Sequence, residues 1–414
     1  MQIPFGEWLP DQPQYLNPGA TTANNVYYAQ NSYKRFPSLV NYSTNNIATD
    51  SRGAGSFRDN AGNVYNFVAN NTDIYQLDGG TFTSRKSSLT GTNTDYFTFT
   101  QFGNYIIASN GVDAPQYYLM GTSTNFANLS AIATGVPTFR VSGVVRDFLV
   151  TGNQSSNQNR IQWSGINDIT TWTAGSKQAD QQDLPGSGGE IVHITSGEIG
   201  YVFRQNQIIR MDYVGGATIF RLSVISPNRG AVYGRTVCQD NRRVFFYADD
   251  GFFEINGDEI IAIGAEKVNR FFDVDLNKAF SDRICAAVDP FNQLALWLYP
   301  SASNTSNTTG ICDKILIYNY ATKKWSTADA SASTIFSQFV GAYTVELMDI
   351  ISENLDQINI ALDTDFWSGG QLYLGAIDSN YKAAIFSGTE NQGTLETREL
   401  ELFPGHRSSI TNVR

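Results

Sequence analysis

Histidine is the side chain most often used for proton transfer near neutral pH, and this chain contains only two, His193 and His406. Each lies in a strand-like run without a neighbouring cysteine or acidic helix face, so neither spacing fits a metal site. A serine nucleophile would be marked by a G-x-S-x-G turn, which the sequence lacks. The sequence leaves a Ser/His/Asp arrangement open but nominates no residue for it.

Acidic residues number 39, so some pair could always face a cleft and support glycoside hydrolysis. The segment SGINDITTW, residues 164–172, resembles the Asp-box of sialidase-like propellers, in which a Ser, an Asp and a Trp clamp a hairpin turn. Asp168 is displaced from the position that the box requires, and the box is structural. A sialidase also needs three arginines that bind a carboxylate. The sequence does not indicate which three arginines would form such a triad among Arg140, Arg146, Arg160, Arg204 and Arg210.

Cysteine and glycine patterns give no sign of a cofactor. Cys238, Cys285 and Cys312 are odd in number, far apart and set in apolar strand-like runs, so we expect buried thiols rather than a zinc site. No P-loop is present, and hairpin turns explain the glycine pairs at 79–80 and 188–189. We therefore expect no cofactor, no metal and no catalytic residues, and interpret the chain as a binding or assembly protein rather than an enzyme.

Composition indicates many short strands joined by turns. Aromatic residues make up 13% and charged residues only 16% of the 414 residues, while Asn, Thr, Ser and Gly are abundant. The net charge of −11 argues against a surface that binds phosphates throughout, although an acidic channel would let DNA slide without sticking. No apolar stretch is long enough to span a membrane and no signal peptide is apparent, so we expect synthesis in the cytoplasm.

The same device recurs along the chain: an apolar or alternating run, a turn rich in Gly, Asn or Asp, and a second run. Each instance predicts a β-hairpin. The seven hairpins start at Asn63, Asn104, Arg146, Glu198, Arg242, Asn292 and Gly370. The steps between these starts are 41, 42, 52, 44, 50 and 78 residues. A period of about 40–50 residues is that of a four-stranded propeller blade.

The repeat predicts an all-β fold, a β-propeller of about seven blades over residues 51–414, with six to eight blades compatible with the spacing. Two segments stand outside the repeat. Residues 1–50 are rich in Pro, Asn, Gln and Tyr and predict an extended N-terminal arm. Residues 326–365 fill the long step as an insertion with one amphipathic helix, whose apolar positions are Leu347, Ile350, Ile351, Leu355, Ile358 and Leu362. Two unrelated β-sandwiches would explain the aromatic content but not the period.

Several stretches resemble the β-propeller hub or nozzle proteins of short-tailed bacteriophages, including packaged-DNA stabilisation proteins. The opening carries Pro10-Asp11, then Asn17-Pro18-Gly19, then Tyr33 with Arg35-Phe36-Pro37. RIQWSGINDITTW resembles a recurring hairpin of that group. The blade from Val244 carries Asp250-Gly251, then Ile263-Gly264 and Lys267-Val268. AAVDPFNQLALWLYPS and KILIYNYATKKWS complete the similarity, which covers about half of the chain in patches that keep their order.

The resemblance implies a structural virion protein of the tail, made in the bacterial host cytoplasm. It would form a homo-oligomeric ring of six or twelve copies that contacts portal or adaptor proteins and other tail proteins. Genomic DNA would pass through the channel without sequence-specific binding. We expect interface residues in the arm, at Trp8, Pro10, Tyr15, Asn17 and Tyr33, with packing of the arm on its own propeller as the alternative.

Two other functions remain open. A carbohydrate-binding or glycan-cleaving propeller would use exposed Tyr and Trp side chains at the blade mouths to stack on sugars. A generic scaffold propeller of a cellular complex would share the fold and the lack of catalytic motifs.

Overall fold

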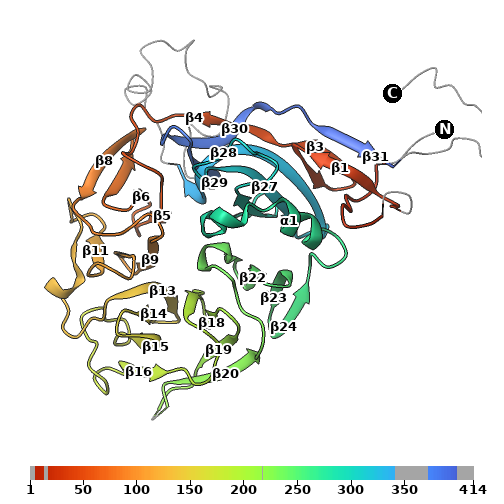
Figure 1. Ribbon diagram of the computed structural model, residues 1–414. Coiled ribbons are helices and arrows are strands. Elements are labelled where there is room, and N and C mark those ends of the chain that lie inside the picture. Colours follow the sequence, from red (N-terminus) through yellow and green to blue (C-terminus); the bar gives the residue numbers. More distant parts are fainter. Residues whose placement is uncertain (1–4, 14–16, 217, 341–371, 399–414) are drawn as a thin grey trace, which may run out of the picture.

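The computed structural model describes residues 5–13, 17–216, 218–340 and 372–398. The first five blades are separate four-stranded antiparallel sheets that follow one another around an axis (Figure 1). Blade 1 contains β5 (Gly53–Arg58), β6 (Val64–Ala69), β7 (Ile74–Asp78) and β8 (Thr81–Lys86); blade 2 contains β9 (Thr98–Phe102), β10 (Tyr105–Ser109), β11 (Gln116–Leu119) and β12 (Ala127–Asn128). Blade 3 contains β13 (Phe139–Val145), β14 (Phe148–Gln154), β15 (Asn157–Trp163) and β16 (Asp180–Asp183). Blade 4 contains β17 (Ile191–Ile194), β18 (Ile199–Arg204), β19 (Ile208–Tyr213) and β20 (Phe220–Ser226); blade 5 contains β21 (Cys238–Asp240), β22 (Arg243–Ala248), β23 (Gly251–Asn256) and β24 (Glu259–Ala262).

The sixth and seventh blades share one long strand. Their strands are β25 (Cys285–Asp289), β26 (Leu294–Tyr299), β27 (Cys312–Asn319), β28 (Lys324–Phe339), β29 (Leu372–Asp378), β30 (Ala383–Glu390) and β4 (Pro37–Asn41), hydrogen-bonded in this order. The first half of β28 pairs with β27 and its second half with β29, and Ala332 takes part in both pairings. The sheet therefore counts as two four-stranded blades, which brings the total to seven.

The N-terminal strand β4 closes the ring. It pairs with β30, so the outermost strand of the last blade comes from the beginning of the chain. Tyr42, directly after β4, donates its backbone N–H to Ala383 O at 3.0 Å. The chain then runs from β4 into blade 1, so the pairing of β4 with β30 ties the last blade to the first.

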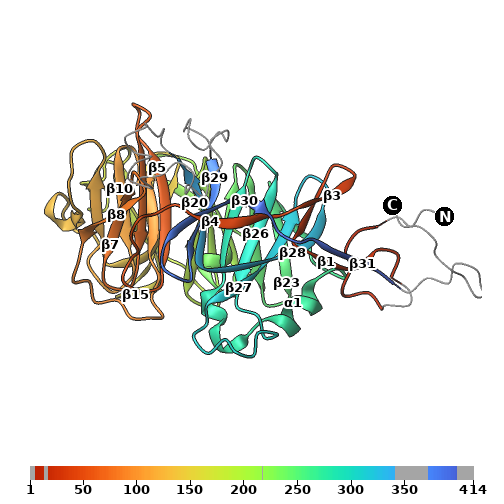
Figure 2. The same cartoon turned by 90° about the horizontal axis from the view of Figure 1, so that it is seen from above.

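A small set of elements lies outside the seven blades. We call β1 (Ala20–Asn24), β2 (Val26–Ala29), β3 (Ser32–Arg35) and β31 (Thr394–Thr397) the rim extension. Strand β1 pairs with β28 and β31, and β2 pairs with β3 (Figure 2). The helix α1 (Asn269–Asp275) and the short 3-10 turns η1 (Leu129–Ala131), η2 (Gly234–Thr236) and η3 (Lys278–Arg283) complete the described elements.

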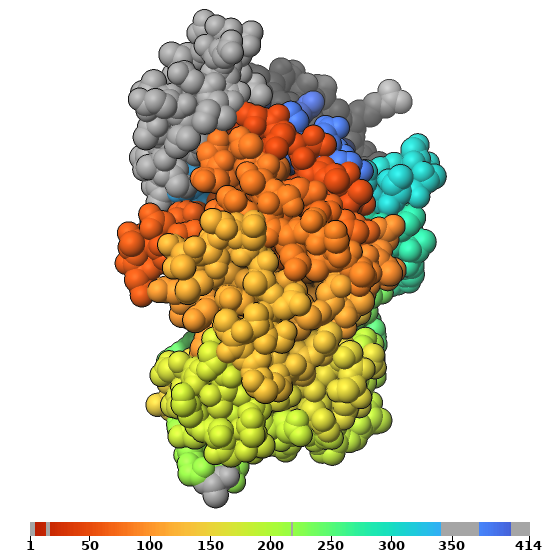
Figure 3. All heavy atoms as spheres, turned by 90° about the vertical axis from the view of Figure 1, so that its left-hand side faces the viewer, coloured from red at the N-terminus to blue at the C-terminus, as the bar shows by residue number. Residues whose placement is uncertain are grey.

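The seven predicted hairpins are confirmed as the two central strands of each blade: β6–β7, β10–β11, β14–β15, β18–β19, β22–β23, β26–β27 and β29–β30. These strands read as apolar runs because they are covered on both faces by neighbouring blades. In β22 and β26, for example, almost every residue is buried. Figure 3 shows blades 1 to 3 stacked in chain order along one side of the molecule.

The segment boundaries differ from the sequence-based prediction. The arm does not end at residue 50 as a separate unit, because β4 belongs to blade 7 and β1 pairs with β28. The insertion does not begin at residue 326, because residues 326–339 continue β28. The predicted helix, residues 347–362, lies outside the described residues.

Candidate functional site: the axial cavity

A cavity of about 360 Å³ runs along the propeller axis. It is lined by residues of β5, β9, β17, β25, the second half of β28, and β21 with the η2 turn before it. Small residues such as Gly53 and Gly234 leave no room beside them: an added Cβ would lie 2.4 Å from Phe97 O and 1.9 Å from Val192 O, respectively. The cavity has the volume of a small-molecule pocket, since such pockets span roughly 300–1,000 Å³.

The residues that precede the innermost strands lie together at one end of this axis. An even number of antiparallel strands returns the chain to the end at which each blade began. The innermost strands β5, β9, β13, β17, β21 and β25 therefore all start at the same end, which we call the entry face. Side chains just before or at these starts, including Arg52, Tyr96, Arg140, Arg235 and Arg283, meet there.

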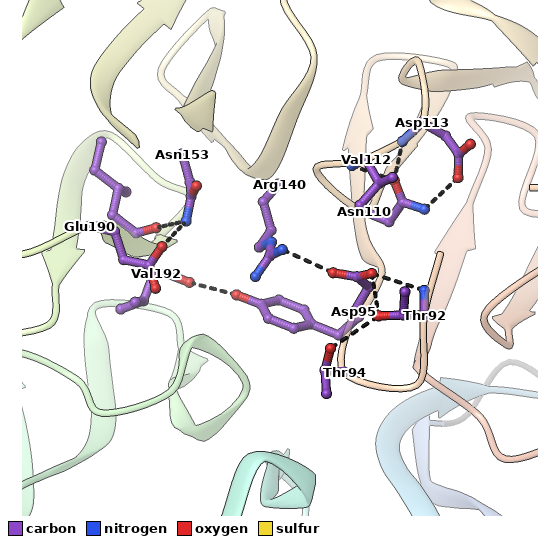
Figure 4. A network of polar contacts seen from close by, with 12 residues as sticks. Thr92, Thr94, Asp95, Asn110, Val112, Asp113, Arg140, Asn153, Glu190 and Val192 are labelled. Carbon is purple, nitrogen blue, oxygen red and sulfur yellow. Dashed lines mark hydrogen bonds and ion pairs between the residues drawn. The ribbon is translucent and has the colours of Figure 1, made fainter. Parts of the chain in front are cut away.

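Polar pairs at the entry face join neighbouring blades (Figure 4). Arg140 Nη2 donates to Asp95 Oδ1 at 3.0 Å, which links blade 3 to the loop before blade 2. Asn153 Nδ2 donates to Glu190 Oε2 at 3.1 Å, which links blade 3 to blade 4. Tyr96 donates its hydroxyl to Val192 O at 3.4 Å, and burial raises the pKa of Tyr96 to about 12. These groups hold the blades together and stay neutral or paired at pH 7.

A second group at the entry face is the arginine cluster, Arg52, Arg235 and Arg283. Arg283 Nη1 lies 2.8 Å from Asp50 Oδ2. Arg235 Nη2 donates to Thr334 Oγ1 at 3.1 Å, and Thr334 in turn donates to the backbone of Ser51, next to Arg52. Burial, together with the charges of Arg283 and Arg235, lowers the pKa of Arg52 to about 10. Three guanidinium groups thus lie within electrostatic reach of one another beside the cavity.

His193 is the one histidine among the described residues, and it lines the cavity. Burial lowers its pKa to about 4, and its backbone partner is Gly234. The imidazole is therefore neutral at pH 7. No carboxylate lies among the cavity-lining residues described, so the cavity supplies neither a triad around His193 nor a pair of carboxylates.

The residues predicted for an interface are largely occupied within their own chain. Trp8 is buried, donates its indole N–H to Thr21 O at 3.1 Å and meets Phe271 edge-on. Asn17 is buried and donates to Leu9 O at 2.8 Å. Tyr33 is half-buried and donates to Gly6 O at 2.8 Å.

Pro10 is half-buried, and Tyr15 lies outside the described residues. The neighbouring Asp11 accepts the backbone N–H groups of Arg270 and Phe271 at 2.9 and 2.7 Å, so this part of the arm is docked on α1. The described arm side chains follow the alternative expectation, packing on the same chain. Contact of the arm with other copies stays a prediction.

The arginines considered in the sequence analysis have structural roles. Arg160 pairs with Asp183, Arg210 with Asp212, and Arg146 lies over the Tyr213 ring. Arg204 is fully buried and donates to five oxygen atoms. None of the arginines in the cluster was among the candidates. These arginines share a position at or shortly before the inner strand of a blade. That shared position can be recognised only once the inner strands are known.

The Asp-box-like segment and the cysteines also have structural roles. Trp172 is buried and donates its indole N–H to Ile169 O at 2.7 Å. The Lys177 ammonium and the Thr170 side chain hold the pKa of Asp168 well below its usual range. All three cysteines are free and buried, as predicted, and burial raises the pKa of each thiol.

The described residues hold neither a metal-binding cluster nor a membrane-spanning helix. No group of three or more His, Cys, Asp or Glu side chains could hold a metal ion. Among the described helices, none is long and apolar enough to cross a membrane.

Topology and closure define the class of this protein as a β-propeller. No family model and no curated protein match the chain. It is similar to the extracellular domain of a hybrid two component system from B. thetaiotaomicron, with 13% identity and a TM-score of 0.48 over 85% of this chain and 40% of that chain. A chain of the Mitotic Checkpoint Complex is similar with 10% identity and a TM-score of 0.44 over 84% of this chain and 97% of that chain. The present chain spans about two fifths of the first structure, and both likenesses concern the fold alone.

Proposed function

We propose that this protein is a structural component of a bacteriophage tail, forming a ring at the portal-proximal hub or nozzle. The order of sequence patches that resemble tail hub proteins is the origin of this proposal. The observation that supports it best is the rim extension, which lies outside the seven blades and is not needed to close them.

The rim extension offers open strand edges to a neighbour. Among the described residues, strand β31 pairs with β1 alone and β3 pairs with β2 alone. Three of the four residues of β3 are exposed, and β31 alternates exposed and half-buried residues. An exposed edge presents unpaired backbone groups that another chain can bind. A ring of copies would cover these edges.

In such a ring, DNA would pass between copies and not through one propeller. The axial cavity of about 360 Å³ has the capacity for a small molecule, far below that of a DNA duplex. The lumen would then be lined by the outer surface of each propeller. The net charge of −11 would suit a lumen along which DNA slides.

Deletion of the arm would be a poor test, because Trp8 and Asn17 are buried in their own chain. A better test changes the exposed edge of β3 by Lys34→Glu and compares it with Thr83→Glu on the exposed outer strand of blade 1. Both variants are expected to fold. Electron microscopy of negatively stained wild-type protein should show rings of six or twelve copies, which Lys34→Glu dissolves and Thr83→Glu retains. A wild-type monomer at every concentration would contradict the proposal.

A carbohydrate-binding propeller is the second candidate, favoured by the small-molecule size of the axial cavity and by Tyr96 in its lining. The five tryptophans in the described part of the chain are all buried, which leaves tyrosines to stack on a sugar. A glycan array and model glycosides test this candidate. The absence of both glycan binding and glycoside turnover would rule it out.

A further inference from the structure

The arginine cluster contains a buried charge without a partner. Arg52 is only 4% exposed, yet its guanidinium donates no hydrogen bond to any described residue and forms no ion pair within 4 Å there. None of its nitrogen atoms is fully buried, so the small exposed part of this side chain is the guanidinium group, which a ligand can reach. Buried charges in proteins are normally paired and hydrogen-bonded, because removal of a charge from water is costly. The absence of a partner needs an explanation.

Arg204 shows how this chain treats a buried arginine with a structural role. It also lacks a carboxylate, but its guanidinium donates to the carbonyl oxygens of Pro185, Gly186 and Gly189 and to the side chains of Asn159 and Gln207, at 2.8 to 3.2 Å. Every nitrogen of Arg204 is therefore satisfied. Arg52, at similar burial, has none of these acceptors, so its unused donors are available to a ligand.

We propose that the arginine cluster binds the carboxylate group of a small anionic ligand that enters the axial cavity. Arg52 and Arg235 carry the binding, because Arg283 is already neutralised by Asp50 at 2.8 Å. Arg235 lines the cavity, and Gly53, the residue after Arg52, lines it as well. A planar guanidinium can bind both oxygens of one carboxylate, and two guanidinium groups can share it.

The charge balance favours a monoanion. The cluster holds three arginines, and the carboxylates that act on Arg52 are Asp50 and Asp282. One positive charge is left over, which a single carboxylate neutralises, whereas a phosphate dianion would exceed it. The other polar groups of the lining, such as Tyr96 and the neutral His193, can contact an uncharged ligand body.

The experiment uses matched pairs of probes that differ only in charge. Thermal unfolding of the full chain is followed at pH 7 with sodium acetate against acetamide and sodium glucuronate against glucose, at constant ionic strength with chloride. We expect acetate or glucuronate to raise the Tm and the neutral partners to leave it unchanged. Titration calorimetry should give at least a tenfold weaker affinity for the same anion in Arg52→Gln and Arg235→Gln, and no change in Arg160→Gln, which alters a half-buried arginine of blade 3 that already pairs with Asp183. Inorganic phosphate, which carries no carboxylate, should bind more weakly.

Three results would overturn the proposal: no effect of either carboxylate on the wild-type protein, equal effects of Arg52→Gln and Arg160→Gln, or tighter binding of phosphate. A second measurement separates ligand binding from a structural role. Without ligand, Arg52→Met should be at least as stable as the wild-type protein, because it removes an unpaired buried charge. A lower Tm for Arg52→Met would mean that the arginine supports the fold. This inference does not rest on the tail function, since ring formation and anion binding are measured separately.

Discussion

Replacement of Arg204 by methionine should destabilise the propeller. The side chain is fully buried and spans from β18 to the loop that joins blades 3 and 4. Methionine retains most of the volume, so the cavity left behind is small. The oxygens of Pro185, Gly186 and Gly189 would lose their donor, whereas the side chains of Asn159 and Gln207 could turn toward other groups.

The magnitude follows from these three carbonyl groups. Pro185 and Gly186 are exposed and Gly189 is half-buried, so water can replace the lost donor at part of these oxygens. A hydrogen bond from a charged group contributes about 1.5–3 kcal/mol, and we count the loss as about one such bond. Arg204 has no carboxylate within 4 Å among the described residues, so removal of its charge offsets part of this cost. We expect the free energy of unfolding to fall by about 1.5–3 kcal/mol.

Equilibrium unfolding in urea, followed by tryptophan fluorescence and far-UV circular dichroism, measures this change. Arg160→Met is the matched control, because Arg160 is half-buried and pairs with the exposed Asp183 at 2.6 Å. An exposed ion pair contributes only about 0.2–1 kcal/mol. If Arg204→Met were as stable as Arg160→Met, the reasoning that unpaired carbonyl groups dominate the cost would be refuted.

Three further predictions concern the cavity, the thiols and the ring closure. His193 binds its proton less readily in the folded state, with a pKa near 4 against 6.5, so stability should rise between pH 4 and 6.5 and then level off. His193→Gln should abolish about 2–3 kcal/mol of that rise, which urea midpoints at pH 4.5 and 7 would show; an identical pH dependence in both proteins would contradict it. The three buried cysteines should react with Ellman's reagent only after unfolding, and fast reaction of the native protein would disprove their burial. Val40→Pro should open the ring at β4, because alternation from Tyr42 directs the Val40 N–H toward β30. Leu39→Pro, whose N–H points away, should cost less, and equal unfolding free energies for the two variants would contradict this closure.

The repeat was predictable from the sequence because the central strands of each blade are covered on both faces. They form unbroken apolar runs, as in β22 and β26, with turn residues between them. The outer and inner strands are harder to predict. They are short, like β12 and β21, or mostly exposed, like β16, so their sequences carry little periodicity.

Closure and the shared strand were missed for a different reason. The pairing of β4 with β30 joins residues more than 300 positions apart, and no local pattern reports such a contact. In β28, the run of small residues from Ala328 to Ser333 looks like a loop in the sequence. It is strand here because small side chains fit where the chain passes from the edge of blade 6 to the axis beside β5 and β25.

The arginine cluster illustrates why sites escape sequence reasoning in a repeat protein. Arg52 precedes Gly53 of β5, and Arg283 stands two residues before Cys285 of β25, so each occupies nearly the same place in its own blade. The repeat places such positions on one ring around the axis, which turns residues separated by 231 positions into neighbours. Exposure and charge alone would have favoured the surface arginines, which pair with carboxylates. An arginine that keeps a buried, unpaired guanidinium lowers the stability of the unliganded fold, and this cost is the physical reason to expect that a ligand offsets it.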